Sequence, residues 1–212
     1  MNLVREATVY LRRCERAWSW QWPSLRRSGP ELARRLSNEA ANLGSSKATR
    51  FSPEIPTLHL LAAKVALLAL GPDAPELATY ERDLLYYKSF NYRATPRQVA
   101  DYDAFKAGLF LRRYEQARPR QRPALRRSGQ ELARQIAGHA STLGTSKATE
   151  CSPEIPRLSL LAAKVALLAL GPDSPDLPAY ECHVLYYKNS SSPEQVALVT
   201  DYEAFKAGVR NQ

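Results

Sequence analysis

The chain has 212 residues, of which 44% are hydrophobic and 24% are charged, and its formal net charge is +9. This composition is typical of a globular protein and excludes wholesale disorder. The basic charge favours anionic partners, of which nucleic acid and an acidic protein come first and a peripheral anionic membrane surface comes third.

One unit occurs twice along the chain. At an offset of 100 residues, 58 of the 97 positions from 11 to 107 are identical without a gap. The repeat predicts a tandem duplication of one helical bundle, with unit boundaries at 1–106 and 107–212. The charge is uneven, because residues 1–50 carry +6 and 101–150 carry +5, whereas 51–100 carry 0 and 151–212 carry −2. The basic surface is therefore expected in the first half of each unit.

The first elements in chain order are two amphipathic helices. Residues 2–17 have apolar side chains at helical spacing, and a second helix is predicted from Ser28 to about Leu43. Ser28 followed by Glu31 matches a capping box, in which each side chain bonds the backbone of the other's turn. The loop that follows, 44–49, contains glycine, hydroxyls and a lysine, so it fits either an ordinary interhelix loop or an anion site.

The best-kept segment is 52–73, which differs from 152–173 at two positions only, Thr57 against Arg157 and His59 against Ser159. It is apolar nearly all round and ends at Gly-Pro, which predicts a buried core helix. It is too short for a membrane span, which needs about 20 apolar residues. Lys64, kept as Lys164, either extends along its stem to the surface or meets an anionic ligand or a carboxylate.

The rest of each unit is also helical in pattern. Asp73 to Glu76 matches another capping box and opens a helix that continues to about Lys88. One unbroken helix is predicted from about 96 to 116, ending the first unit and beginning the second. A matching helix runs from Ser192 to about Val209. The fold class is therefore all-α, with about nine helices in two bundles joined by a continuous bridging helix.

Aromatic side chains mark a second candidate surface. Residues 18–23 read Trp-Ser-Trp-Gln-Trp-Pro, and each tryptophan is an arginine in the second copy. These tryptophans either pack on the core of the first unit or form an exposed patch for a partner, lipid or unstacked bases. Two tyrosines are expected to point outward. The candidate partner-binding residues are Trp18, Trp20, Trp22, Tyr86 and Tyr186.

Arginine is the residue type that most suits backbone phosphates, because its planar guanidinium binds two oxygens at once. The chain lacks known base-reading motifs, so recognition of the phosphate backbone or of shape is expected. The candidate nucleic-acid-binding residues are Arg12, Arg13, Arg26, Arg27, Arg34, Arg35, Lys47, Arg112, Arg113, Arg118, Arg120, Arg122, Arg126, Arg127, Arg134 and Lys147. The alternative hypothesis is a structural or adaptor subunit of a larger assembly, such as a ribonucleoprotein, that contacts its partners through the tryptophan segment.

The remaining chemistry favours a non-enzymatic protein without cofactor or metal. Cys14, Cys151 and Cys182 have no cysteine counterparts in the other copy, which argues against a disulfide framework and against a zinc site. No Ser/His/Asp set or carboxylate pair stands out. The free thiols and the absence of a secretory signal pattern predict a reducing intracellular compartment, whether cytoplasm, nucleus or organelle matrix.

Overall fold

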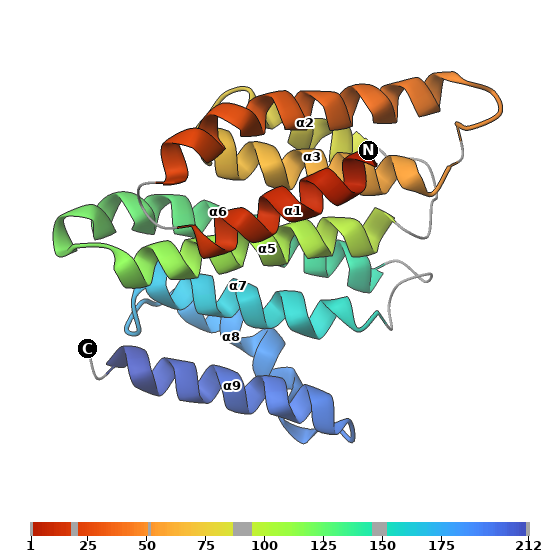
Figure 1. Cartoon of the computed structure of the whole chain (residues 1–212). Coiled ribbons are helices and arrows are strands. Elements are labelled where there is room, and N and C mark those ends of the chain that lie inside the picture. Colours follow the sequence, from red (N-terminus) through yellow and green to blue (C-terminus); the bar gives the residue numbers. More distant parts are fainter. Residues whose placement is uncertain (1, 18–20, 51, 87–94, 146–151, 211–212) are drawn as a thin grey trace. The chain divides into compact units, whose positions relative to one another are not determined.

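The structure is a computed structural model that describes residues 2–17, 21–50, 52–86, 95–145 and 152–210 (Figure 1). These residues form nine α-helices and contain no β-strand. The prediction of an all-α fold is confirmed. None of the helices within these residues is long and apolar enough to cross a membrane.

The chain divides into two compact units, Met1–Tyr102 and Asp103–Gln212. The predicted boundary between 106 and 107 stays a prediction. The helices of the first unit are α1 (Leu3–Arg16), α2 (Trp22–Ser45), α3 (Glu54–Leu70), α4 (Leu77–Tyr86) and the start of α5 (Thr95–Gln116). The second unit holds the rest of α5, α6 (Arg122–Thr145), α7 (Glu154–Leu170), α8 (Leu177–Leu185) and α9 (Pro193–Arg210), with short 3₁₀ helices η3 (Pro119–Gln121) and η4 (Tyr186–Asn189).

The helix predicted to bridge the two units is continuous. α5 runs as one α-helix from Thr95 to Gln116, so it contains the last residues of the first unit and the first residues of the second. The side chains of 86, 95 and 96 lie outside the described part.

The core helix of each unit is the predicted apolar segment. Every residue from Ala62 to Ala69 of α3 is buried except Lys64, and α7 shows the same pattern. α3 packs mainly on α2, and α7 packs mainly on α6. Each core helix ends at a glycine with a positive φ, 96° at Gly71 and 94° at Gly171, a conformation that costs glycine little because it has no Cβ.

The lysine inside the core helix pairs with a carboxylate of its own unit. Lys64 Nζ lies 2.6 Å from Asp101 Oδ2, and Lys164 Nζ lies 2.7 Å from Asp201 Oδ2. Each lysine thereby ties the core helix to the last helix of its unit, while the carboxylate stays half exposed. Of the two interpretations from the sequence, the carboxylate partner is the one the structure contains.

The predicted start of the second helix was wrong. α2 begins at Trp22 and α6 at Arg122, so Ser28 and Ser128 lie inside their helices and cap nothing. The hydroxyl of Ser28 donates to the carbonyls of Ser24 and Leu25. A serine inside a helix can satisfy its hydroxyl in this way. The helix begins instead at Trp22, and Pro23 lies in its first turn, a position that proline favours.

The capping box predicted at 73–76 was wrong for the opposite reason, because the helix begins after it. α4 begins at Leu77, after a turn in which the amide of Leu77 donates to the carbonyl of Ala74. Asp73 and Glu76 therefore precede the helix. Ser52, by contrast, does act at a helix start, because its hydroxyl accepts from the amide of Glu54 at 3.3 Å.

Candidate nucleic-acid interface

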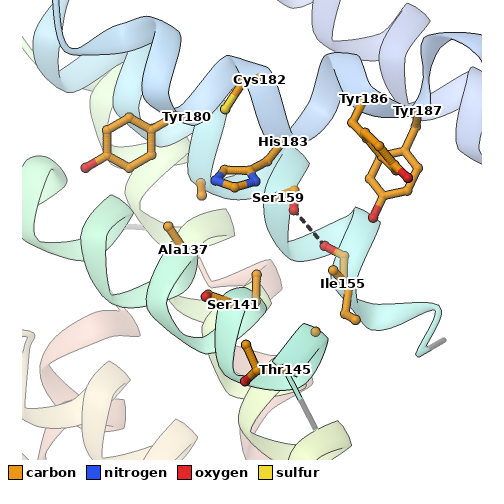
Figure 2. A pocket seen from close by; sticks show the side chains of 13 residues that line it. Ala137, Ser141, Thr145, Ile155, Ser159, Tyr180, Cys182, His183, Tyr186 and Tyr187 are labelled. Carbon is orange, nitrogen blue, oxygen red and sulfur yellow. Dashed lines mark hydrogen bonds between the residues drawn. The ribbon is translucent and has the colours of Figure 1, made fainter. Parts of the chain in front are cut away.

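Unit 2 contains a hollow of about 480 Å³ between α6, α7, α8 and η4 (Figure 2). Its lining is mainly apolar and aromatic, and the described residues that form it include no arginine or lysine. This hollow therefore has the wrong character for a phosphate backbone. It is considered separately below.

Unit 1 contains a hollow of a different kind, with a volume of about 550 Å³ between α1 and α2. Its lining residues are Val9, Arg12, Arg13, Arg16, Gln21, Ser24 and Leu25. The three arginines come from the end of α1, where residues i and i+4 share a face of the helix. The side chain of Tyr10 ties the two helices together here, because its hydroxyl donates to the carbonyl of Leu25 at 2.9 Å.

These three arginines are not neutralised by carboxylates. All three side chains are exposed, and none of them forms an ion pair within the residues that the structure describes. The next exposed arginines, Arg26 and Arg27 on α2, likewise have no ion pair there. The end of α1 and the start of α2 therefore carry a concentration of uncompensated positive charge.

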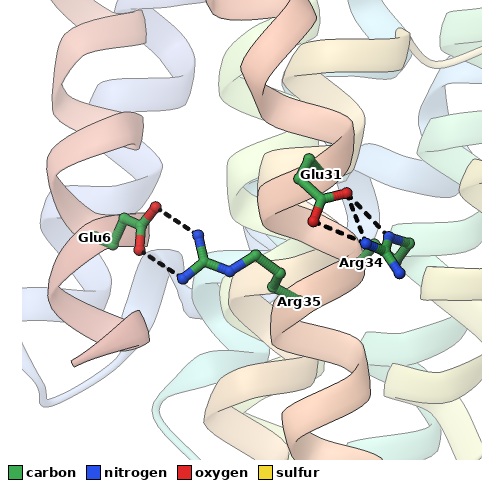
Figure 3. A network of polar contacts seen from close by, with 4 residues as sticks. All are labelled: Glu6, Glu31, Arg34 and Arg35. Carbon is green, nitrogen blue, oxygen red and sulfur yellow. Dashed lines mark hydrogen bonds and ion pairs between the residues drawn. The ribbon is translucent and has the colours of Figure 1, made fainter. Parts of the chain in front are cut away.

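Other predicted arginines already have acidic partners. Arg34 binds Glu31 with its guanidinium at 2.8 Å, and Arg35 binds Glu6 of α1 at 3.0 Å (Figure 3). In unit 2, Arg134 pairs with Glu131 in the same way as Arg34 with Glu31. Exposed pairs of this kind contribute little stability, but each glutamate cancels the formal charge of the arginine that a phosphate would meet.

In unit 2, two candidate arginines contact one tyrosine. The guanidinium of Arg122 lies 5.5 Å from the centre of the Tyr114 ring, and Arg126 Nε donates to the Tyr114 hydroxyl at 3.3 Å. Arg112 Nε donates to the carbonyl of Gly108 at 3.3 Å. Arg113, Arg118, Arg120 and Arg127 are exposed. The contacts of Arg112, Arg122 and Arg126 position their guanidinium groups without cancelling their charge.

The other predicted site residues fall into two groups. Lys47 is exposed in the turn after α2, and Trp22 is half-buried as the first residue of that helix. Tyr186 is 82% exposed, which confirms that it points outward, and its ring meets the ring of Tyr187 edge-on at 5.4 Å. Trp18, Trp20, Lys147 and the side chain of Tyr86 lie outside the described residues.

Sequence reasoning missed a polar cluster in unit 1. The hydroxyl of Ser37 on α2 donates to Asp83 Oδ2 on α4 at 3.4 Å, and Asp83 acts electrostatically on His59 of α3. His59 is only 6% exposed, and burial lowers the pKa of its imidazole, an effect that the negative charge of Asp83 opposes. The available signal was that all three residues change together in the second copy, to Ala137, Ser159 and His183.

This cluster differs from a nucleophilic triad. In a triad the imidazole takes the proton of the hydroxyl and the carboxylate orients the imidazole. Here the hydroxyl of Ser37 donates directly to the carboxylate of Asp83. Among the described residues, no group of three His, Cys, Asp or Glu side chains is placed to hold a metal ion.

Unit 2 has two buried acidic contacts of its own. Asp103 Oδ2 lies 2.5 Å from His139 Nδ1, and the side chain of Asp103 is only 3% exposed. Glu181 accepts from the Tyr202 hydroxyl at 2.6 Å and from Lys206 Nζ at 2.5 Å. Hydrogen bonds from Lys206 and Tyr202 outweigh the burial of Glu181, so the pKa of its carboxyl is lowered. These acids are structural contacts within unit 2.

Comparisons with protein-family models, with curated protein sequences and with solved structures gave no match.

Proposed function

We propose that the protein binds nucleic acid through its backbone phosphates, with the hollow between α1 and α2 as the main contact. The observation that carries this proposal is the convergence of Arg12, Arg13 and Arg16 on one hollow of about 550 Å³ without a carboxylate partner in the described residues. Guanidinium groups bind phosphate oxygens in pairs. The neutral polar residues Gln21 and Ser24 complete the lining, and the Ser24 hydroxyl donates to the carbonyl of Gln21 at 2.9 Å.

The basic residues around the hollow extend this contact. Arg26 and Arg27 lie about one turn beyond Ser24 on α2, so a strand leaving the hollow would meet further positive charge. The arginines near Tyr114 are the proposed second contact, on unit 2. Two linked weak contacts bind one chain more tightly than either contact does alone, provided that both are engaged together.

The adaptor function ranks second in this proposal. It rests on the tryptophan segment, of which Trp22 is half-buried in α2 and therefore presents only part of its ring. Tyr186 is the most exposed aromatic side chain that supports it. A protein partner would recognise these aromatic groups, whereas it would not require three uncompensated arginines in one hollow.

We infer further that the two units are copies of one ancestral bundle. Helices α3 and α7 have bounds that differ by 100 residues, as do α2 and α6. The pairs Lys64–Asp101 and Lys164–Asp201 repeat the same contact. This inference explains why a basic first half occurs in each unit.

The function is tested by the fluorescence anisotropy of labelled single-stranded RNA and duplex DNA. For a contact that neutralises three phosphates of duplex DNA, raising the salt from about 50 mM to about 200 mM should weaken binding roughly 40-fold. Binding that is confined to the micromolar range at low salt, or that does not change with salt, would overturn the proposal.

A charge-matched pair of variants locates the contact. Replacing Arg12, Arg13 and Arg16 by Gln should reduce affinity about tenfold or more and lower the salt slope by about 1 for each arginine. The control replaces Arg34, Arg35 and Arg134 by Gln, which removes the same charge from arginines that already have acidic partners. Equal losses in the two variants would mean that net charge alone, and not the hollow, attracts the nucleic acid.

A further inference from the structure

The hollow of unit 2 is the feature that the proposed function leaves unexplained. It lies between α6, α7, α8 and η4, and Figure 2 shows side chains from these elements around it. Ile155, Tyr180, Tyr186 and Tyr187 provide much of its lining. Its volume of about 480 Å³ falls within the range of about 300 to 1,000 Å³ typical of small-molecule pockets.

The lining defines which ligands would be stable there. None of the described lining residues is Asp, Glu, Lys or Arg, and the Ser159 hydroxyl is already used, because it donates to the carbonyl of Ile155 at 3.0 Å. A charged ligand would lose its hydration without gaining a counter-charge. Three tyrosine rings offer faces and edges to another ring. His183 and Ser141 provide a small number of polar groups for orientation.

The matching place in unit 1 carries different side chains. At the positions matching Ser159 and His183, unit 1 has His59 and Asp83, and the imidazole of His59 is buried at 6% exposure. The helices that carry His59 and Ser159, α3 and α7, have identical lengths of 17 residues. A serine in place of a histidine leaves free the volume that an imidazole would occupy. Ser159 is thus one of the lining residues that separate the two versions of this place, together with Ala137 and His183.

We propose that the hollow of unit 2 is a binding site for a small, uncharged aromatic molecule. The proposal is independent of nucleic-acid binding, because the hollow shares no residue with the basic hollow of unit 1. The ring of the ligand would lie against tyrosine rings of the lining, and the small side chain of Ser159 would leave room for it.

The probe for this site is N-phenylnaphthylamine, a neutral aromatic amine whose fluorescence rises in apolar surroundings. We expect saturable binding by the full chain with micromolar affinity. Ser159→His places the residue of unit 1 into the hollow and should weaken binding about tenfold or more. The matched control is Arg157→Thr, the other position at which α7 differs from α3, which is exposed and does not line the hollow, and it should bind as the parent protein does.

A second measurement reports on the site directly. Cys182 lines the hollow and is an exposed free thiol, so its rate of alkylation by N-ethylmaleimide can be followed on its own peptide by mass spectrometry. Probe at about ten times the Kd of the parent protein should slow this rate about fivefold or more in the parent protein and no more than about twofold in Ser159→His. An unchanged rate in the parent protein, or equal affinity of Ser159→His and the parent, would overturn the proposal even if one variant folds poorly.

Discussion

The same place in the two units carries opposite chemistry. In unit 1 the core helix presents His59 beside the charge of Asp83, and Ser37 donates to that carboxylate. In unit 2 the core helix presents Ser159, whose hydroxyl bonds its own helix, and the matching place opens into an apolar hollow. Between the two core helices only positions 57 and 59 differ from 157 and 159. Two core helices that are nearly identical in sequence can therefore line quite different sites when a few neighbouring side chains change.

A second contrast concerns the acid at the start of unit 2. Asp103 is buried and its carboxylate bonds His139, whereas the matching positions of unit 1 are Leu3 and Glu39. Unit 1 thus places an apolar residue where unit 2 places a buried carboxylate. A buried carboxylate such as Asp103 needs a hydrogen-bond partner, here His139, whereas the apolar Leu3 at the matching position needs none.

The largest expected effect comes from removing that partner. His139→Ala should destabilise unit 2 by about 3 kcal/mol, because it leaves the buried carboxylate of Asp103 without its hydrogen-bond partner. Amide hydrogen exchange of α6 and α7 measures this, since it reports on each unit separately in a chain with two units. The control is Glu39→Gln in unit 1, an exposed position that should change exchange little. Equal effects of the two variants would show that the Asp103–His139 contact contributes nothing.

The next effect tests a close helix contact common to both units. A Cβ at Gly29 would overlap the Ala69 Cβ and the Tyr10 hydroxyl, and a Cβ at Gly129 would lie 2.5 Å from the Phe110 ring and 2.9 Å from Ala169. Gly29→Ala and Gly129→Ala should each cost about 1 to 3 kcal/mol. Gly29→Ala should cost more, because the Ala69 Cβ is fixed to its backbone while the ring of Phe110 can turn.

Thermal unfolding followed by circular dichroism measures the two glycine variants. Gly138→Ala is their control, because a Cβ there meets no atom within 4 Å. Alanine has the higher helix propensity, so this variant should gain about 0.5 to 1 kcal/mol. If all three variants are equally stable, the crossing at Gly29 and Gly129 is looser than the structure describes.

The elements that local patterns define were predictable. The run of apolar residues and the Gly-Pro that follows it identified the core helix and its end at Gly71, because both signals lie within one turn of each other in sequence. The start of α2 was missed because Ser28 and Glu31 fit a capping box equally well when they lie inside a helix. There the serine hydroxyl bonds back to a carbonyl of the preceding turn.

The sites depend on contacts between helices, which sequence patterns do not encode. The polar cluster of unit 1 combines residues of three helices, Ser37, His59 and Asp83, and no spacing in the sequence predicts that they meet. Arg16 was missed as a site residue because its counterpart in the second copy is Gln116, so the repeat gave it no emphasis. The sequence equally could not separate Arg12, which lacks a carboxylate partner among the described residues, from Arg34, which bonds Glu31.

The smallest predicted effect is a difference in the pH dependence of stability between the parent protein and His59→Ser. Burial lowers the pKa of His59 in the folded protein below its unfolded value of about 6.5. The unfolded chain therefore binds the proton more readily, and the stability that neutral His59 supports is present above about pH 6.5 and lost as the pH falls below it. The loss is at most about 1.4 kcal/mol for each pH unit. His59→Ser, which introduces the residue of unit 2, should remove this part of the pH dependence.

Urea unfolding followed by tryptophan fluorescence measures this effect at about pH 7.5 and about pH 5.5. All three tryptophans lie at positions 18, 20 and 22, so the signal reports on unit 1. The parent protein should lose more stability between the two pH values than His59→Ser does. Ser159→His is the reciprocal variant and should leave the tryptophan signal as it is in the parent. If the parent and His59→Ser show the same pH dependence of stability, His59 takes up its proton as easily in the folded unit as in the unfolded chain. The two core helices would then differ only in the volume of the side chain at this position.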